Sequence, residues 1–138
     1  MTKKNELKIE EIKKLIPHRY PFLLIDKLID IIPKESAVGV KNVTFNENFF
    51  QGHFESMAQS AGTLVMYSLK KNQENISVYL LTVDKAKFRK PVCPGDTLFH
   101  RVIKKQNVKN IWKFKCTSFV NDKLVAEAEV SAIINSII

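Results

Sequence analysis

Hydrophobic residues recur with two different spacings along this chain, and the spacing changes after its middle. The longest segment with helical spacing is Glu55–Lys71, in which apolar residues lie three or four positions apart at Met57, Ala61, Leu64, Val65 and Leu69. A shorter helix is predicted over Ile9–Ile16, followed at once by Pro17, which cannot continue it. Small residues on the long helix, including Gly62, predict tight packing against a neighbouring sheet, because glycine costs a helix about 1 kcal/mol relative to alanine.

Alternation of apolar and polar residues predicts six strands, two before the long helix and four after it. They are Phe22–Ile32, Ala37–Phe45, Ile76–Phe88, Thr97–Lys105, Ile111–Val120 and Leu124–Ile134. A half-polar antiparallel sheet must cover its apolar face, and the long helix is the element apolar enough to do so. We therefore predict a single α+β domain over residues 1–138, in which a curved antiparallel sheet wraps one helix. Because one helix rarely covers so wide a sheet, we also expect a dimer.

Composition narrows the class of protein further. The 138 residues are 45% hydrophobic and 26% charged, which excludes a disordered chain. No apolar run is long enough to span a bilayer, and the charged start has no signal-peptide pattern, so we expect a cytoplasmic location and no membrane. Cys93 and Cys116 are far apart and lack metal-ligand spacing, so we expect free thiols, a core position for Cys116, and no metal.

The charge is strongly positive, at +8 with 22 Lys plus Arg against 14 Asp plus Glu. Such an excess favours an acidic partner. Nucleic acid is one candidate, but no nucleic-acid-binding motif accompanies the scattered basic residues. An acidic protein partner explains the charge equally well, and so does a proteome rich in lysine.

Candidate acid/base residues gather at the start of the long helix. His53 follows an aromatic stretch, and Glu55 stands two positions later, so the two side chains form a possible acid/base pair. Two interpretations of Glu55 are open: a carboxylate that the helix dipole favours, or a general acid whose pKa is raised by apolar neighbours. Gln59, one helical turn on, could orient it. We expect His18 to be structural, bonded within its turn between two prolines, and His100 to lie on the polar face of its strand.

Several blocks of this sequence resemble the bacterial-type (3R)-hydroxyacyl-acyl carrier protein dehydratases of type II fatty acid synthesis, which have a hotdog fold. The blocks span nearly the whole chain in family order: Leu15–Asp26, Lys41–Thr44, Asn46-Glu47, Phe49–Phe54, Glu55–Gly62, Asp84–Val92, Pro94–Asp96 and Leu124–Ala128. The resemblance implies removal of water from a 3-hydroxyacyl thioester to give the trans-2-enoyl thioester, without metal or other cofactor.

The resemblance also implies site residues and partners. His53 and Glu55 match the catalytic pair, with a neutral histidine and a protonated glutamate that meet across a dimer interface. Substrate contacts are implied for Phe50, Gly52, Phe54 and Gln59. The substrate is carried by acyl carrier protein, a small acidic partner, for which Lys87, Arg89 and Lys90 are the candidate contacts. Both a homodimer and a trimer of dimers fit the family.

This chain departs from the family between Phe54 and Glu55. Family members insert a proline-rich segment there, which carries the first part of the helix and a glycine N–H that polarises the substrate carbonyl. A true deletion would shorten the helix and put activity in doubt. We predict instead that Phe54 and Glu55 are not joined in the structure and that a mobile loop links them.

Three alternative functions remain open. A hotdog thioesterase would share the fold but would not need the Gly52-His53-Phe54 block. A dehydratase–isomerase typically carries aspartate where this chain has Glu55, so the glutamate favours dehydration alone. A non-catalytic acyl-thioester binding protein would normally carry a DNA-binding region, for which 138 residues leave no room.

Overall fold

The computed structural model describes residues 5–46, 53–72, 74 and 76–136. Its elements follow the predicted order of a short helix, two strands, a long helix and four strands. They are α1 (Ile9–Leu15), β1 (Lys27–Ile32), β2 (Ser36–Asn42), α2 (His53–Ser68), β3 (Ile76–Phe88), β4 (Thr97–Val108), β5 (Ile111–Val120) and β6 (Lys123–Ser136).

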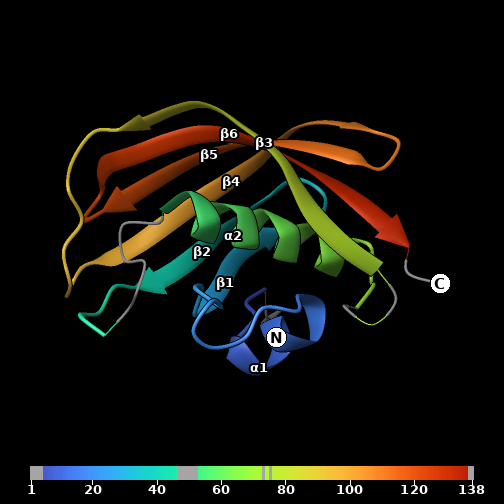
Figure 1. Ribbon diagram of the computed structural model, residues 1–138, viewed down its shortest axis with the longest axis horizontal. Helices are drawn as coiled ribbons and strands as arrows, with labels where there is room; N and C mark the ends of the chain where they lie inside the picture. Colours follow the sequence, from blue (N-terminus) through green and yellow to red (C-terminus); the bar gives the residue numbers. More distant parts are fainter. Residues whose placement is uncertain (1–4, 47–52, 73, 75, 137–138) are drawn as a thin grey trace.

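All six strands belong to one antiparallel sheet, in the order β1-β2-β4-β5-β6-β3. Figure 1 shows the sheet curled around α2, with α1 beside α2 on the side away from β4, β5 and β6. This arrangement confirms the predicted α+β hotdog fold. The strands β1 and β3 form the two edges of the sheet. As an edge strand, β3 pairs on one side only, with β6, within the described residues.

Most predicted strands are confirmed, and β3 and β5 have the predicted bounds. The exception is the first strand, which begins at Lys27 and not at Phe22. Between two prolines the chain turns back on itself, because the N–H groups of Phe22 and Leu23 both donate to the carbonyl of Arg19, at 2.7 and 3.1 Å. The part of the first predicted strand before Lys27 is therefore wrong.

The predicted interruption between Phe54 and Glu55 is also wrong. Helix α2 begins at His53 and continues through both residues without a break. No proline or glycine stands between His53 and Ala61, so nothing in this stretch opposes helix formation. His53 and Phe54 therefore belong to the first turn of the helix.

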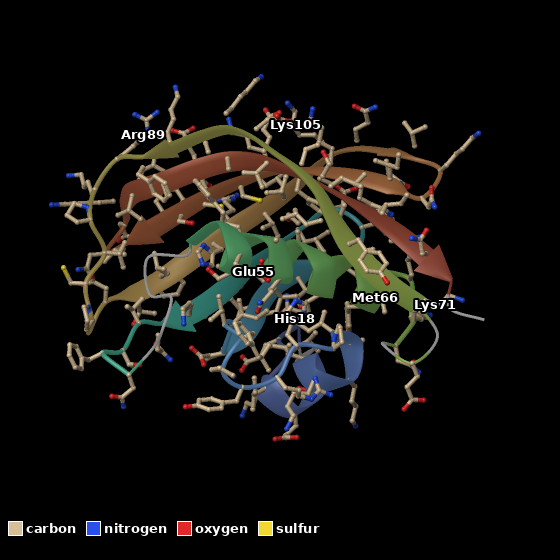
Figure 2. All side chains as sticks on the ribbon, viewed as in Figure 1. His18, Glu55, Met66, Lys71, Arg89 and Lys105 are labelled. Atoms are coloured by element: carbon tan, nitrogen blue, oxygen red, sulfur yellow. The ribbon has the colours of Figure 1, made fainter. Side chains whose placement is uncertain are left out.

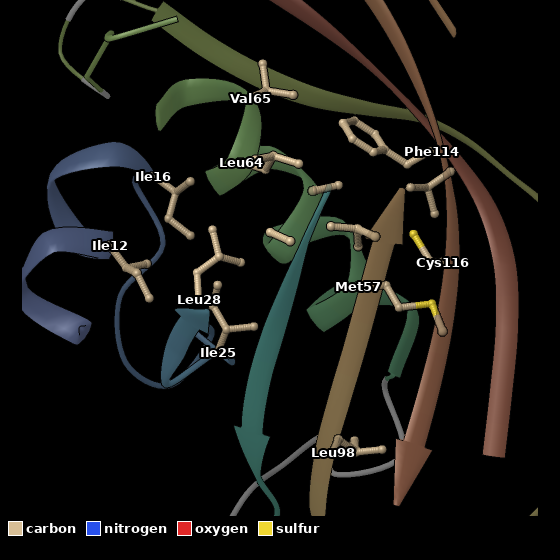
Figure 3. Packing of buried hydrophobic residues seen from close by; sticks show 14 of the residues in the cluster. Ile12, Ile16, Ile25, Leu28, Met57, Leu64, Val65, Leu98, Phe114 and Cys116 are labelled. Carbon is tan, nitrogen blue, oxygen red and sulfur yellow. The ribbon is translucent and has the colours of Figure 1, made fainter. Parts of the chain in front are cut away.

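The apolar face of α2 packs into the curve of the sheet, as its spacing predicts (Figure 3). Met57, Leu64 and Val65 are almost fully buried, in one core cluster with Phe114 and Cys116 of β5. Burial raises the pKa of the Cys116 thiol to about 12, so this cysteine is an inert core residue, as expected from the sequence.

Helix α2 approaches β2 most closely at Gly39, not at Gly62. A methyl group on Gly39 would overlap Ser60 Oγ and lie 2.7 Å from Ser60 Cβ. At Gly62 an added methyl group would meet Val78 Cγ1 at 3.8 Å, which is an ordinary contact. Tight packing therefore does not explain Gly62, contrary to the sequence-based interpretation. The missing side chain there leaves open space beside the helix.

Replacing Gly39 by alanine should destabilise the protein by about 1–3 kcal/mol, because the added methyl group forces α2 away from β2. Urea unfolding of Gly39→Ala measures the loss. Gly62→Ala is the matched control: the methyl group fits, and helix propensity favours alanine by about 1 kcal/mol. Equal stability of the two variants would contradict this account of the helix–sheet contact.

Candidate active site

A small cavity beside α2 is lined by two titratable side chains, His18 and Glu55. Figure 2 labels both of them. Its volume is about 60 Å³. Apart from His18, Glu55 and Gln59, the described residues that line it are apolar or glycine, and they come from the segment around Ile16, from α2, and from β3 and β6. The open space at Gly62 belongs to this cavity. The site therefore combines an apolar pocket with a small polar group at one end.

The Gln59 side chain holds Glu55 in place. Its Nε2 donates to Glu55 Oε2 at 2.9 Å and to the carbonyl of Phe22 at 2.8 Å, while its Oε1 accepts from the N–H of Leu24 at 2.8 Å. Gln59 is buried, so these bonds are protected from water. The prediction that Gln59 orients Glu55 from one helical turn away is confirmed.

His18 is positioned by its neighbour Arg19. The Arg19 guanidinium donates to the carbonyls of Lys13, Ile16 and His18, at 2.9, 3.0 and 2.7 Å. These bonds tie the segment that carries His18 to the end of α1. Pro17, which precedes His18, further limits the backbone. The histidine is thus presented to α2 from a well-anchored turn.

Glu55 faces His18 across the mouth of the cavity. Glu55 Oε2 lies 3.5 Å from His18 Nε2, and the two side chains are 49% and 31% exposed. The hydrogen bond with His18 lowers the pKa of Glu55 below its ordinary value, with Gln59 also contributing, although partial burial acts in the opposite direction. This lowering is opposite in direction to the rise predicted from apolar neighbours.

The ring of His18 does not form the hydrogen bond within its turn that the sequence predicts. Its Nε2 faces Glu55, and the buried Nδ1 has no partner among the described residues. Sequence reasoning missed this contact because it joins positions 37 residues apart in a tertiary arrangement. The available signal was the rigid Pro17–Pro21 motif, which restrains a histidine more than a surface loop requires.

His53 and Glu55 occupy the same turn of α2. The structure gives the backbone position of His53 alone, so the predicted acid/base pair stays a prediction. Phe50 and Gly52 lie outside the described residues. Phe54 packs on Phe88 of β3, with ring centroids 4.6 Å apart, and is not among the residues that line the cavity.

His100 is fully buried, which contradicts its predicted position on the polar face of β4. Ser56 Oγ lies 2.6 Å from His100 Nε2, and Ser118 Oγ lies 2.6 Å from Nδ1. The two hydroxyl groups satisfy both ring nitrogens, which lets a polar ring lie in the core. Because Ser56 follows Glu55 in the chain, this network also fixes the start of α2 against the sheet.

Lys87, Arg89 and Lys90 are exposed near the end of β3. Arg89 forms an ion pair with Glu127, so its charge is partly balanced (its position is marked in Figure 2). Among the described residues, no group of three His, Cys, Asp or Glu side chains is placed to hold a metal ion. No helix in this part of the chain has the length and apolar character of a membrane span.

The hotdog fold, with a glutamate beside an apolar cavity, is compatible with enzymes that act on acyl groups. Sequence comparison identifies the family. A family model described as the FabA-like domain matches residues 16–129. The chain therefore belongs to the FabA-like family.

Curated relatives within this family are dehydratases named FabZ. The chain is 51% identical to the 3-hydroxyacyl-acyl-carrier-protein dehydratase FabZ of Gluconobacter oxydans (strain 621H), over 91% of this chain and 82% of the relative. It is 46% identical to FabZ of Paramagnetospirillum magneticum (strain ATCC 700264 / AMB-1), over 91% and 86%. The alignment with the Gluconobacter oxydans relative is 138 positions long, yet it includes only 91% of the 138 residues of this chain. At some aligned positions the relative therefore has a residue and this chain has none.

Solved structures share the fold at low sequence identity. The dehydratase heterocomplex ApeI:P from Xenorhabdus doucetiae matches with a TM-score of 0.76 at 13% identity, over 88% of this chain and 89% of that one. The HP0420 homologue from Helicobacter felis matches with a TM-score of 0.69 at 10% identity, over 91% and 88%. At such identities the likeness establishes the fold alone.

The pKa of Glu55 should lie below 4.5 and should rise in His18→Ala, because the histidine is the main group that lowers it. The chemical shift of the Glu55 side-chain carboxyl carbon, followed by NMR against pH, measures both values. A lowered pKa in the folded state stabilises the protein above pH 4.5, and this contribution is lost as the pH falls through the folded value. An unchanged midpoint in His18→Ala would contradict the assignment.

Proposed function

We propose that this protein removes water from (3R)-3-hydroxyacyl-acyl carrier protein to form the trans-2-enoyl thioester. The observation that carries the proposal is the combination of about 50% identity to FabZ dehydratases with a glutamate held at the mouth of an apolar cavity. The apolar walls suit an acyl chain, and the polar mouth suits its reacting end. The same fold supports thioesterases, so the assignment depends on the site and not on the architecture.

The reaction needs two proton transfers. A base removes the proton from C2, and an acid protonates the hydroxyl group on C3 so that it leaves as water. Negative charge develops on the thioester oxygen during this step, and the free N–H groups in the first turn of α2 offer donors for it. This contribution comes from His53, Phe54 and Glu55, because the helix of this chain starts there.

We assign the two acid/base roles to Glu55 and to His53 from a second copy of the chain. Two copies are supported by their backbone positions, since residues two apart in a helix are separated by about 200° around its axis. In this assignment His53 removes the C2 proton, and Glu55 acts on the hydroxyl group on C3 as it leaves. Gln59 fixes Glu55, and Phe50, Gly52 and Phe54 remain the candidate substrate contacts from the family resemblance.

The second copy is proposed to dock along β3. This strand is an edge of the sheet, and among the described residues no strand pairs with its outer side. Its large apolar residues are exposed, among them Tyr79, Leu81 and Phe88, at 55%, 48% and 64%. A long apolar edge strand favours pairing with another strand. A homodimer through β3, alone or within a trimer of dimers, would cover it.

The acyl group is proposed to arrive on acyl carrier protein, whose acidic surface would meet the basic surface of this chain. The net charge of +8 supports this partner. Lys87 and Lys90 are exposed without a described ion pair, whereas Arg89 already contacts Glu127. We therefore assign most of the docking charge to the two lysines, with Arg89 in a smaller role.

Purified protein should convert 3-hydroxybutyryl thioester to the enoyl thioester, detected by its ultraviolet absorbance. Glu55→Gln should lower kcat/KM by about 10²–10⁴-fold, since it removes one acid/base group while keeping the side-chain shape. His53→Ala should cause a loss of similar size. Release of free thiol in place of the enoyl product would show a thioesterase, and neither product would indicate a binding protein.

Removing charge near the end of β3 should weaken the use of carrier protein. Lys87→Ala/Lys90→Ala should raise KM for the carrier-protein substrate several-fold, and the difference from wild type should shrink above about 0.1 M salt, where exposed charges are screened beyond about 10 Å. Lys14→Ala/Lys27→Ala, which removes two exposed charges from α1 and β1, is the control. Equal effects of the two double variants would contradict a local docking surface.

A further inference from the structure

Gly62 has no structural explanation within the described part of the molecule. It lies in α2 with a helical backbone, and among the described glycines Gly95 alone has a positive φ. An alanine methyl group would fit at position 62, since its nearest described neighbour outside the helix is Val78 Cγ1 at 3.8 Å. Alanine would also stabilise the helix, because glycine is the weaker helix former. Neither backbone conformation nor packing therefore requires a glycine here.

The space at Gly62 is part of the apolar cavity that begins at Glu55. Both residues line this cavity, and their separation along the helix is about 10 Å at a rise of roughly 1.5 Å per residue. The cavity therefore extends along two turns of α2. Its other walls are apolar side chains of β3 and β6, among them Val78 and Val130. The carboxylate stands at one end of this length, and Val78 faces Gly62 at the other.

The gap between Gly62 and Val78 has the width of one hydrocarbon chain. A methyl carbon on Gly62 would already be in van der Waals contact with Val78 Cγ1, because 3.8 Å is a favourable separation for two carbon atoms. The glycine therefore leaves room for one carbon atom between the helix and the strand. An unbranched acyl chain fits such a gap, whereas a chain with a methyl branch at this point does not.

We infer that Gly62 sets the length of acyl chain that this protein accepts, and that unbranched chains of medium length pass between Gly62 and Val78. This inference rests on the proposed dehydratase function and names its substrate class. The reacting carbons of the substrate lie at Glu55, and the tail follows α2 to the gap. The missing side chain at position 62 weakens the helix, but it keeps the path of the acyl chain open.

The wild-type protein should therefore use both short and medium acyl chains. With the reacting carbons at Glu55, the tail of a 3-hydroxybutyryl group ends before Gly62, whereas the tail of a 3-hydroxydecanoyl group reaches it. Both acyl groups are presented on the same carrier protein, and kcat/KM is measured from the ultraviolet absorbance of the enoyl product. Wild type that uses the butyryl substrate but not the decanoyl substrate would overturn the inference.

Gly62→Ala should close the gap to medium chains. The ratio of decanoyl to butyryl kcat/KM should fall by about 10–200-fold, which is the effect of one methyl group in an apolar pocket. The loss should appear mainly as a higher KM for the decanoyl substrate, because the acid/base groups are not altered. A glycine with a purely structural role would give equal changes for both substrates. An unchanged ratio in Gly62→Ala would therefore contradict the assignment.

Val65→Ile is the matched control, because it also adds one methyl group to α2. Val65 is buried in the core and is not among the described residues that line the cavity, so the ratio should stay at the wild-type value. Thermal unfolding compares the variants, and Gly62→Ala should be at least as stable as wild type. An equal fall of the ratio in both variants would show a general disturbance of the helix and would overturn the role of Gly62.

Val78→Ala tests the opposite side of the gap. It removes the Cγ1 atom that faces Gly62 and so returns the width that Gly62→Ala takes away. The double variant Gly62→Ala/Val78→Ala should therefore regain most of the decanoyl activity lost in Gly62→Ala. A double variant with the same low ratio as Gly62→Ala would show that the acyl chain does not pass between these two residues.

The two proposals fail in distinguishable ways. Wild-type protein that forms no enoyl product from either substrate would refute the dehydratase function itself. Wild type that is active on both substrates, together with a Gly62→Ala variant of unchanged ratio, would leave the function standing and overturn the role of Gly62.

Discussion

The buried amide of Gln59 is the interaction on which the site depends. Its three hydrogen bonds connect α2 to the backbone of Phe22 and Leu24, just before β1, and to the carboxylate of Glu55. A buried amide that lost these partners would leave a backbone N–H and a carbonyl unsatisfied, at about 1–3 kcal/mol each. The same side chain therefore holds the first strand to the central helix and aims the glutamate. Gln59 thus contributes both to the stability of the fold and to the position of the catalytic candidate Glu55.

The start of α2 shows how the structure accommodates a missing segment. Ser56 reaches His100 on β4, and Ser60 packs against Gly39 on β2, so the first turns of the helix are tied to two strands. These contacts do not involve residues before His53. The helix therefore keeps its place against the sheet even though the family's proline-rich segment is absent. On the same turn, Glu55 faces His18.

The spacing of apolar residues predicted the fold well, because apolar residues recur along a helix or strand on the face that is buried. The prediction for His100 was wrong because it followed the charged neighbours in the strand and not the alternation. Leu98, His100 and Val102 all point into the core, as a strict period of two requires. Glu55 and Gln59 could be paired from helical spacing alone. The contact of His18 with Glu55 could not, because it arises from tertiary packing, and the resulting pKa of Glu55 changes in the opposite direction to the one predicted.

Strand β3 connects assembly to chemistry. Val78 and Leu80 line the cavity beside α2, and the same strand forms the open apolar edge of the sheet. A second copy paired along this edge would lie against the wall of the cavity and would exclude water from its mouth. Exclusion of water strengthens the electrostatic interaction between His18 and Glu55, since the effective dielectric constant falls. Dimer formation would thus complete the acyl site and would also strengthen the contact between His18 and Glu55.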